Sequence, residues 1–292
     1  MRTGPTLALG TVQFGLPYGL SGAAEPVTPD TVRAILSKAA DSGVTRLDTA
    51  AGYGDIEERL PSLIGDLPFE VVSKIPAPPP ALPAAEIPAF VGLAIETSLN
   101  RLGGLLAGLL FHDPALVAGP GGDELWAMAE DRCQQKGISL GVSGYDPAHV
   151  AELAERHPFA MAQLPANAFD QRIAGMDVGG CELTARSLFL QGLLLMPAEQ
   201  ADLRVPGSGP AVARWTRWCD DQAVTLLEGA LAVAKAFDCA YAVVGVDSLP
   251  QWEQIADAWS RVSPVAAPGL ALDSPAITDP RGWRRHSEIV QS

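Results

Sequence analysis

Short apolar runs alternate with longer amphipathic segments along most of the chain. Between Asp30 and Ser42, for example, Val32, Ile35 and Ala39 recur at the spacing of one helix face. The same pattern predicts eight strands, which are Thr6–Leu9, Val44–Asp48, Phe69–Lys74, Leu106–Phe111, Ile138–Val142, Ala160–Leu164, Glu182–Arg186 and Ala240–Val244. It predicts helices over Asp30–Ser42, Ile56–Ile64, Ile87–Leu102, Glu124–Lys136, Pro147–Arg156, Ala223–Phe237 and Pro250–Arg261.

Short strands that are mostly followed by a helix indicate βαβ units and a parallel sheet. Eight such units close into a (β/α)8 barrel of the TIM type, and barrels of about 250 residues form one domain. We therefore expect residues 1–292 to form a single α/β barrel domain. From about residue 263 the chain is rich in Pro and Ala without periodicity, which predicts an irregular tail on the surface.

Three connections depart from this rhythm. The segment between strands six and seven has room only for a very short helix near Ile173–Val178. The segment Gln191–Asp221 is long and contains Pro and Gly, which predicts a functional or lid-like loop. The Pro-rich stretch Pro76–Pro88 follows strand three and is expected to cover part of the same barrel face.

Ionisable residues end three consecutive predicted strands. Asp48 ends strand two, Lys74 ends strand three, and His112 directly follows strand four. Tyr53 lies five residues after Asp48 in a Gly-rich loop. Because the carboxyl ends of barrel strands converge on the active site, these residues are expected to meet there. Each alone has an ordinary structural explanation, but four on one face favour a site.

The four residue types suit carbonyl reduction. Tyr53 can donate a proton, and the ammonium of Lys74 is expected to lower the pKa of the phenol. Asp48 can hold Lys74 charged and in place, and His112 can hydrogen-bond a carbonyl oxygen as negative charge builds there. Since no side chain donates a hydride, a cofactor is required.

These residues resemble the aldo-keto reductase family, and more narrowly a bacterial subgroup of short aldo-keto reductases. The resemblance covers roughly residues 5 to 262 and rests on Leu47-Asp48-Thr49-Ala50, Gly52-Tyr53-Gly54, Ser73-Lys74 and Phe111-His112. It implies that Asp48, Tyr53, Lys74 and His112 form the catalytic tetrad. It also implies NADP(H), or NAD(H), bound in an extended form without a Rossmann fold.

The resemblance further implies a set of cofactor contacts. Ser143 and Gln163 would read the nicotinamide carboxamide, although Gly144 replaces the usual Asn and Gln163 could equally be a core amide. Arg186 stands where many members have an aromatic residue that stacks on the nicotinamide, and a planar guanidinium can also stack. The remaining expected contacts are Gly10, Thr11, Asp48, Ser187, Leu188, Gln191, Gly192, Gly245, Asp247, Ser248, Gln251 and Gln254.

The turn after the last strand bears on the choice of cofactor. In the family this turn holds the adenosine 2′-phosphate, typically with Lys or Arg, whereas here it carries Asp247 and no basic residue. A carboxylate repels a phosphate and accepts a hydrogen bond from a 2′-hydroxyl, as in NAD sites of other folds. The sequence therefore favours NAD(H) slightly, although Arg261 could supply the missing positive charge.

The expected activity is oxidation or reduction of an alcohol/carbonyl pair, with a small or sugar-like substrate. A redox-neutral epimerase or lyase that retains its nicotinamide, and a non-catalytic nucleotide-binding member of the family, remain alternatives. A metal-dependent barrel hydrolase is disfavoured, because the four His residues and the carboxylates show no metal-site spacing.

Bulk composition narrows the partners and the compartment. The formal net charge of -14 disfavours nucleic acid and anionic membrane, which need Lys and Arg. The chain contains no stretch of about 18 apolar residues, so no membrane span is expected. The first ten residues do not read as a signal peptide, and the four cysteines form no CxxC pair. We expect a cytoplasmic monomer or homodimer.

Overall fold

Eight parallel strands form a closed barrel in the computed structural model, which describes residues 4–20, 25–176 and 179–283. Each strand pairs with its neighbours in chain order, and β8 closes onto β1, so that Gly10 pairs with both Asp48 and Gly245. The strands are β1 (Thr6–Gly10), β2 (Arg46–Asp48), β3 (Glu70–Ile75), β4 (Leu106–Phe111), β5 (Ser139–Ser143), β6 (Met161–Pro165), β7 (Glu182–Arg186) and β8 (Tyr241–Gly245). The prediction of a (β/α)8 TIM barrel is confirmed.

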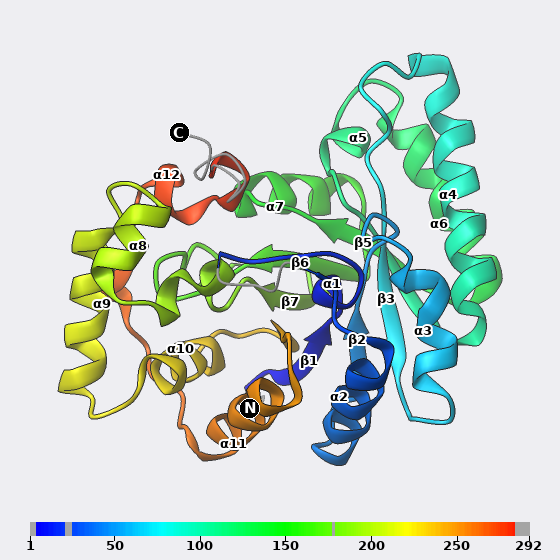
Figure 1. The fold of residues 1–292 in the computed structure, drawn as a ribbon. Helices are drawn as coiled ribbons and strands as arrows, with labels where there is room; N and C mark the ends of the chain where they lie inside the picture. Colours follow the sequence, from blue (N-terminus) through cyan, green and yellow to red (C-terminus); the bar gives the residue numbers. More distant parts are fainter. Residues whose placement is uncertain (1–3, 21–24, 177–178, 284–292) are drawn as a thin grey trace.

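Helices surround the strands on all sides (Figure 1). The larger ones are α2 (Pro29–Asp41), α3 (Ile56–Ile64), α4 (Ile87–Leu102), α6 (Gly122–Lys136), α7 (Pro147–Arg156), α8 (Ala198–Arg204), α9 (Gly209–Asp221), α10 (Leu226–Lys235) and α11 (Leu249–Arg261). Short turns of helix are α1 (Val12–Gly15), α5 (Ala115–Ala118), α12 (Pro275–Thr278), η1 (Ala84–Glu86), η2 (Gly103–Leu105), η3 (Leu190–Leu195), η4 (Pro268–Leu270) and η5 (Pro280–Gly282). Their apolar faces pack on the outside of the strands and form the main core.

The barrel interior is built in layers. Val72, Leu110 and Met161 pack together as a small core separate from the main one. Residues two positions apart on a strand point to the same face. Each of these three apolar residues is followed, two positions later, by a polar residue on its own face. These polar residues are Lys74, His112 and Gln163. The strand period thus places the ionisable groups directly above an apolar layer, at the carboxyl ends of the strands.

The opposite end of the barrel carries an ionic plug. Arg46 is buried and donates to Glu70 at 2.7 Å and to Glu182 at 2.7 Å. Its guanidinium also lies 4.2 Å from the ring centre of Tyr241. The guanidinium is therefore surrounded by two carboxylates and an aromatic ring, and we interpret it as a structural ion cluster at the amino end of the barrel.

The prediction of a long loop over Gln191–Asp221 is wrong, because α8 and α9 occupy most of it. In α9, Val212, Trp215 and Cys219 recur at helical spacing and are buried. The Pro and Gly residues that suggested a loop serve the short connection instead, where Gly207 has φ +88° and Pro210 stands in the first turn of α9. Pro in the first turn does not interrupt a helix.

Two further boundaries differ from the prediction. Residues 172–175 form turns instead of a helix near Ile173–Val178, since Gly175 has φ +74°, and Val178 lies outside the described residues. Helix α10 begins at Leu226, after Ala223 with φ +54° and a capping box between Thr225 and Glu228. The expected helix start at Ala223 was therefore too early.

The described part of the tail, residues 264–283, holds only short helical turns but is anchored to the barrel. Ala267, Leu270 and Ile277 are buried, and the Leu272 amide donates to the carbonyl of Phe169. The tail thereby returns to the carboxyl ends of the strands. None of the residues 76–88, the Pro-rich segment after β3, lines the large cavity found there.

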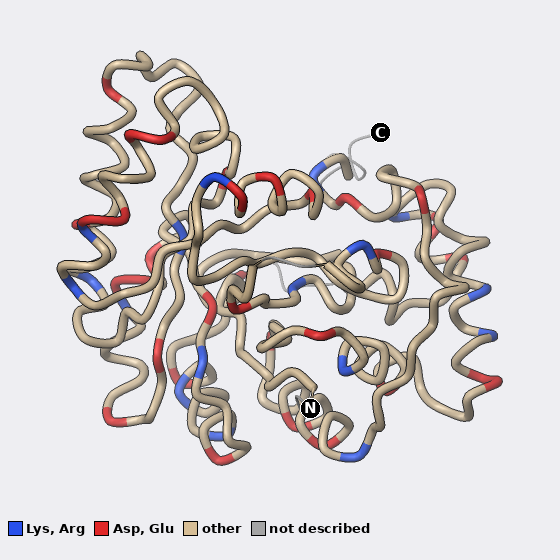
Figure 2. Tube along the Cα trace, turned by 180° about the vertical axis from the view of Figure 1, so that it is seen from behind, with Lys and Arg blue, Asp and Glu red and all other residues tan. Residues whose placement is uncertain are grey.

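Charged residues are spread over several outer segments and are not gathered into one basic stretch (Figure 2). In the part of the chain that the structure describes, no helix has the length and apolar character needed to cross a membrane.

Candidate active site

A cavity of ≈ 730 Å³ opens at the carboxyl ends of the strands. Asp48, Tyr53, Lys74 and His112 all line it. They come from the end of β2, the loop that follows it, the end of β3 and the residue after β4. The structure therefore brings together all four residues that the sequence predicted to form one site.

Lys74 and Asp48 form a buried ion pair at the base of the cavity. The Lys74 ammonium donates to both carboxylate oxygens of Asp48 and to the carbonyl of Thr49, each at 2.8 Å. Only 1% of the Lys74 side chain and 10% of the Asp48 side chain are exposed. Burial lowers the pKa of Lys74, and the negative charge of Asp48 opposes that change. The contact between Asp48 and Lys74 is the one expected from the sequence.

Tyr53 is placed by two glycines that allow close backbone approach. A Cβ on Gly15 would lie 1.9 Å from the Tyr53 carbonyl oxygen, and Gly54 has φ +65°. The Lys74 ammonium lies 5.3 Å from the centre of the Tyr53 ring. The His112 ring stands edge-on to the Tyr53 ring, with 6.4 Å between the ring centres. The phenol and the imidazole thus face the same part of the cavity.

The two potential proton carriers are both neutral at neutral pH. Burial, together with the charge of Asp48, raises the pKa of Tyr53. Desolvation within the cavity lowers the pKa of His112 to about 4, and the nearby charges of Lys74 and Arg186 act in the same direction. The expectation of a lowered Tyr53 pKa was wrong for the free protein, because burial and the charge of Asp48 raise that pKa.

Most of the predicted cofactor residues line the same cavity as the tetrad. They are Gly10, Thr11, Asp48, Arg186, Ser187, Leu188, Gln191, Gly192, Gly245, Asp247, Gln251 and Gln254. Ser143, Gln163 and Ser248 are not part of its wall. Gln163 donates to Asp48 at 2.6 Å and accepts from Ser143 at 3.4 Å, whereas Ser248 caps α11. Their contacts with a cofactor stay predictions.

The loop after β7 has an unusual backbone. Ser187, Leu190 and Gln191 have φ of 60°, 48° and 53°, in the left-handed region that side-chain-bearing residues rarely adopt. Within this loop the amides of Leu190 and Gly192 donate to the carbonyls of Ser187 and Phe189, both at 2.9 Å. The Gln191 carbonyl accepts from the Leu20 amide, so the segment after β1 holds this loop in place.

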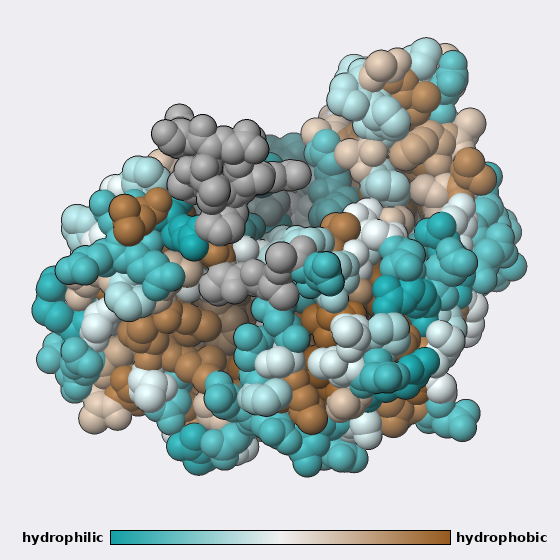
Figure 3. Space-filling view, in the orientation of Figure 1, coloured by the Kyte–Doolittle hydropathy of each residue, from teal (hydrophilic) through white to brown (hydrophobic). Residues whose placement is uncertain are grey.

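Among the described residues, none that lines the end of the cavity around Asp247 is positively charged. The lining residues there are Thr225, Leu226, Leu227, Asp247, Gln251, Gln254 and Ile255. Burial raises the pKa of Asp247, whose backbone amide donates to the Gln251 side chain at 2.7 Å. Arg261 pairs with Asp257 and Glu228 and does not line the cavity. Figure 3 shows a hydrophobic area between α9 and α10, surrounded by hydrophilic residues.

Sequence reasoning missed several residues of the cavity wall, of which Gln13, Tyr18, Tyr145 and Arg281 are polar. The Gln13 side chain packs where a Cβ on Gly245 would collide with it at 2.5 Å, and its Oε1 is buried without a hydrogen-bond partner. Burial raises the pKa of Tyr18 to about 12. Tyr18 and Tyr145 follow the predicted β1 and β5, which was a usable signal, whereas nothing local in the tail singles out Arg281.

Within the described residues no group of three or more His, Cys, Asp or Glu side chains gathers as a candidate metal site. The chemistry of this cavity, as far as the described chain carries it, rests on the buried Lys74–Asp48 pair, two neutral proton carriers and a long wall of amide and hydroxyl groups.

Comparison with known proteins agrees with the geometry. A family model described as the aldo/keto reductase family matches residues 6–263. An aldo-keto reductase of Bacillus halodurans in its holo form superposes with a TM-score of 0.69 at 17% identity, covering 92% of both chains. The glycerol dehydrogenase of Gluconobacter oxydans gives a TM-score of 0.64 at 20% identity, covering 88% of this chain and 86% of that one. None of the curated proteins matches the sequence. At these identities the structural likeness concerns the fold.

Proposed function

Because the chain belongs to the aldo/keto reductase family, we propose that it interconverts a small or sugar-like carbonyl compound and the corresponding alcohol, with NAD(H) as its cofactor. The observation that carries the proposal is the meeting of Asp48, Tyr53, Lys74 and His112 in one cavity. A nicotinamide bound in that cavity would supply the hydride that no side chain provides.

The residues of the cavity suit a dinucleotide. Ser187, Leu188, Phe189, Gln191 and Gly192 line the cavity, and this loop would hold the pyrophosphate. The buried Oε1 of Gln13 lacks a hydrogen-bond partner in the protein and would accept from a ribose hydroxyl. Asp247 is half-buried, and none of the described residues that line the cavity around it is Lys or Arg. Both features favour a 2′-hydroxyl over a 2′-phosphate.

Tyr53 acts as the acid in the direction of reduction. Its raised pKa keeps the phenol protonated, so the proton is present for transfer to the substrate oxygen. The neutral His112 donates a hydrogen bond to the same oxygen as negative charge develops there. Lys74, fixed by Asp48 and the Thr49 carbonyl, stabilises the phenolate that remains. In the reverse direction the phenolate takes the proton from the alcohol.

Titration of the purified protein with NADH and NADPH tests the proposal, with the nicotinamide fluorescence as the signal. We expect saturable binding of both, with NADH tighter, followed by oxidation of the bound NADH when aldehydes are added. Absence of binding to protein that carries no retained nucleotide would contradict the proposal. Tight binding without turnover of any aldehyde or alcohol would contradict the redox assignment alone.

A further inference from the structure

Two guanidinium groups contact one aromatic ring in the wall of the cavity. The Cζ atom of Arg186 lies 4.1 Å from the centre of the Tyr145 ring, and that of Arg281 lies 3.9 Å from it. Both guanidinium groups therefore contact the Tyr145 ring. All three residues line the cavity that contains the tetrad. They come from three separate places in the chain: the end of β7, the loop after β5 and the tail.

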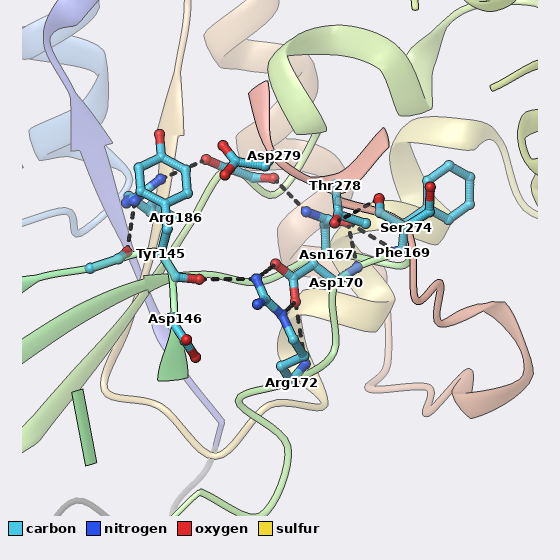
Figure 4. A network of polar contacts seen from close by, with 12 residues as sticks. Tyr145, Asp146, Asn167, Phe169, Asp170, Arg172, Arg186, Ser274, Thr278 and Asp279 are labelled. Carbon is cyan, nitrogen blue, oxygen red and sulfur yellow. Dashed lines mark hydrogen bonds and ion pairs between the residues drawn. The ribbon is translucent and has the colours of Figure 1, made fainter. Parts of the chain in front are cut away.

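Buried polar residues fix the position of this stack. The Tyr145 carbonyl accepts from Arg172 at 3.0 Å, and Arg172 is bound to Asp170, which is 1% exposed. Figure 4 shows Arg172 reaching the Tyr145 backbone, with Arg186 and Asp279 beside the Tyr145 ring. Asn167 also donates to the Ser187 carbonyl, at 3.2 Å. The Tyr145 ring and the Arg186 guanidinium are therefore held in place through the loops after β5 and β7.

The stack carries more positive than negative charge. The acceptors that the structure shows for Arg186 are neutral oxygens, the Gly144 carbonyl at 2.8 Å and the Ser187 hydroxyl at 3.3 Å. Arg281 is paired with Asp279, the carboxylate that the structure shows in contact with this stack. The nearby Asp113 is exposed and is not part of the cavity wall. In a protein with a net charge of -14, a positive cavity mouth is a local exception.

We propose that Arg186, Tyr145 and Arg281 form a subsite for a carboxylate or phosphate group of the substrate, so that this enzyme prefers anionic carbonyl compounds. The proposal rests on the function proposed above. A guanidinium binds a carboxylate or phosphate through two parallel hydrogen bonds, and stacking on an aromatic ring fixes the plane of its donors. Such a contact would hold one end of the substrate while the carbonyl lies near Tyr53.

Both a substrate and the pyrophosphate of the cofactor carry the anionic chemistry that this stack would bind. The location of Arg281 favours the substrate. Arg281 contacts the ring of Tyr145, and a Cβ on the preceding Gly144 would lie 3.5 Å from Pro114, two residues after His112. The loop Ser187–Gly192, where the pyrophosphate is expected, follows Arg186 in the chain. Substitution of Arg281 should therefore change substrate affinity and leave cofactor affinity unchanged.

The test compares 4-formylbenzoate with its uncharged methyl ester in the presence of saturating NADH. The wild-type protein should show a kcat/KM about ten-fold higher for the acid, and Arg281→Met should remove most of that preference, since a partly exposed charge-assisted pair contributes about 1.4 kcal/mol. The kcat/KM of the ester and the Kd of NADH should change by less than about two-fold. Arg281→Lys should keep part of the preference, because it retains the charge.

Arg33→Met is the matched control. Arg33 is also an exposed arginine with a carboxylate partner, Asp30 at 2.9 Å, but lies on α2 away from the cavity wall. Equal kcat/KM for acid and ester in the wild-type protein, or an equal loss of both in Arg281→Met, would overturn the subsite. A weaker Kd for NADH in Arg281→Met would assign the anion to the cofactor instead.

The outcome also separates this proposal from the function on which it rests. If neither aldehyde is reduced, the redox assignment fails and calorimetric titration of the two compounds decides the subsite. Binding of the acid that is tighter than that of the ester, and that Arg281→Met weakens, would keep the subsite. Equal binding of acid and ester would overturn it.

Discussion

Substitution of Lys74 by Met should destabilise the protein strongly, and a second substitution at Asp48 should reverse most of that loss. In the native protein both carboxylate oxygens of Asp48 accept from Lys74 at 2.8 Å. Lys74→Met leaves that carboxylate buried with the Gln163 amide, at 2.6 Å, as its remaining side-chain donor. Removing one partner of a buried ion pair leaves an uncompensated charge, and this penalty dominates the expected effect.

The magnitude follows from the burial of the pair. Loss of one partner of a fully buried pair costs about 3–5 kcal/mol, and the 10% exposure of Asp48 to the cavity places the cost near the lower limit, about 3 kcal/mol. For a protein of this size that corresponds to a decrease in Tm of about 6–12 °C. In Lys74→Met/Asp48→Asn no charge is buried, and only lost hydrogen bonds remain, about 1 kcal/mol.

Thermal unfolding followed by circular dichroism measures the four proteins of this cycle. Asp48→Asn alone should be milder than Lys74→Met, because burial already lowers the pKa of Lys74 and the amine can release its proton. All three variants should lose turnover. A double variant as unstable as Lys74→Met, measured in the same buffer, would refute the reasoning, since the loss would then come from packing and not from the unpaired carboxylate.

Three further outcomes are expected. Tyr53→Phe should lower turnover by about 100-fold or more while the Kd of NADH, measured by fluorescence, stays nearly unchanged; retained turnover would remove Tyr53 from its role as acid. Asp247→Arg should raise the affinity for NADPH relative to NADH by about ten-fold, and an unchanged ratio of the two Kd values would mean that Asp247 does not face the adenosine. The pKa of His112 is about 4 in the folded protein, below its usual value, so the unfolded chain binds a proton at a higher pH than the folded one. Wild-type stability should therefore fall as the pH decreases from about 6.5 to 4, and His112→Gln should lack that part of the slope in urea unfolding; identical slopes would contradict a neutral His112.

The periodicity of apolar residues was sufficient to predict the barrel and the residues that share one end of it. The strand that ends at Lys74 and the strand that precedes His112 were each predicted within one residue of β3 and β4. Once the strands are parallel and consecutive, their carboxyl ends must meet, so the convergence of Asp48, Lys74 and His112 followed from topology. Composition misled the prediction in α8 and α9, because a Pro-Gly connection was taken to characterise the whole segment.

The rest of the site depends on contacts between distant segments, which a local pattern does not encode. Tyr145 and Arg281 are separated by more than a hundred residues, and they meet because buried groups of the tail such as Leu270 fix its path back to the barrel. The pKa values are of the same kind. Burial of the Tyr53 phenol and the charge of Asp48 raise its pKa although the Lys74 ammonium is nearby, and neither burial nor pairing is visible in the sequence.

The two ends of the barrel interior show what distinguishes a functional charge from a structural one. Arg46 and Lys74 are both buried cations on neighbouring strands. Arg46 has two carboxylates and an aromatic face around it at the amino end. Lys74 is equally well paired, but the groups beside it, Tyr53 and Arg186, face an open cavity. A buried, well-paired cation therefore does not by itself identify a functional site. The site is identified by the polar groups beside Lys74, Tyr53 and Arg186, which face the cavity and can still donate hydrogen bonds to a ligand.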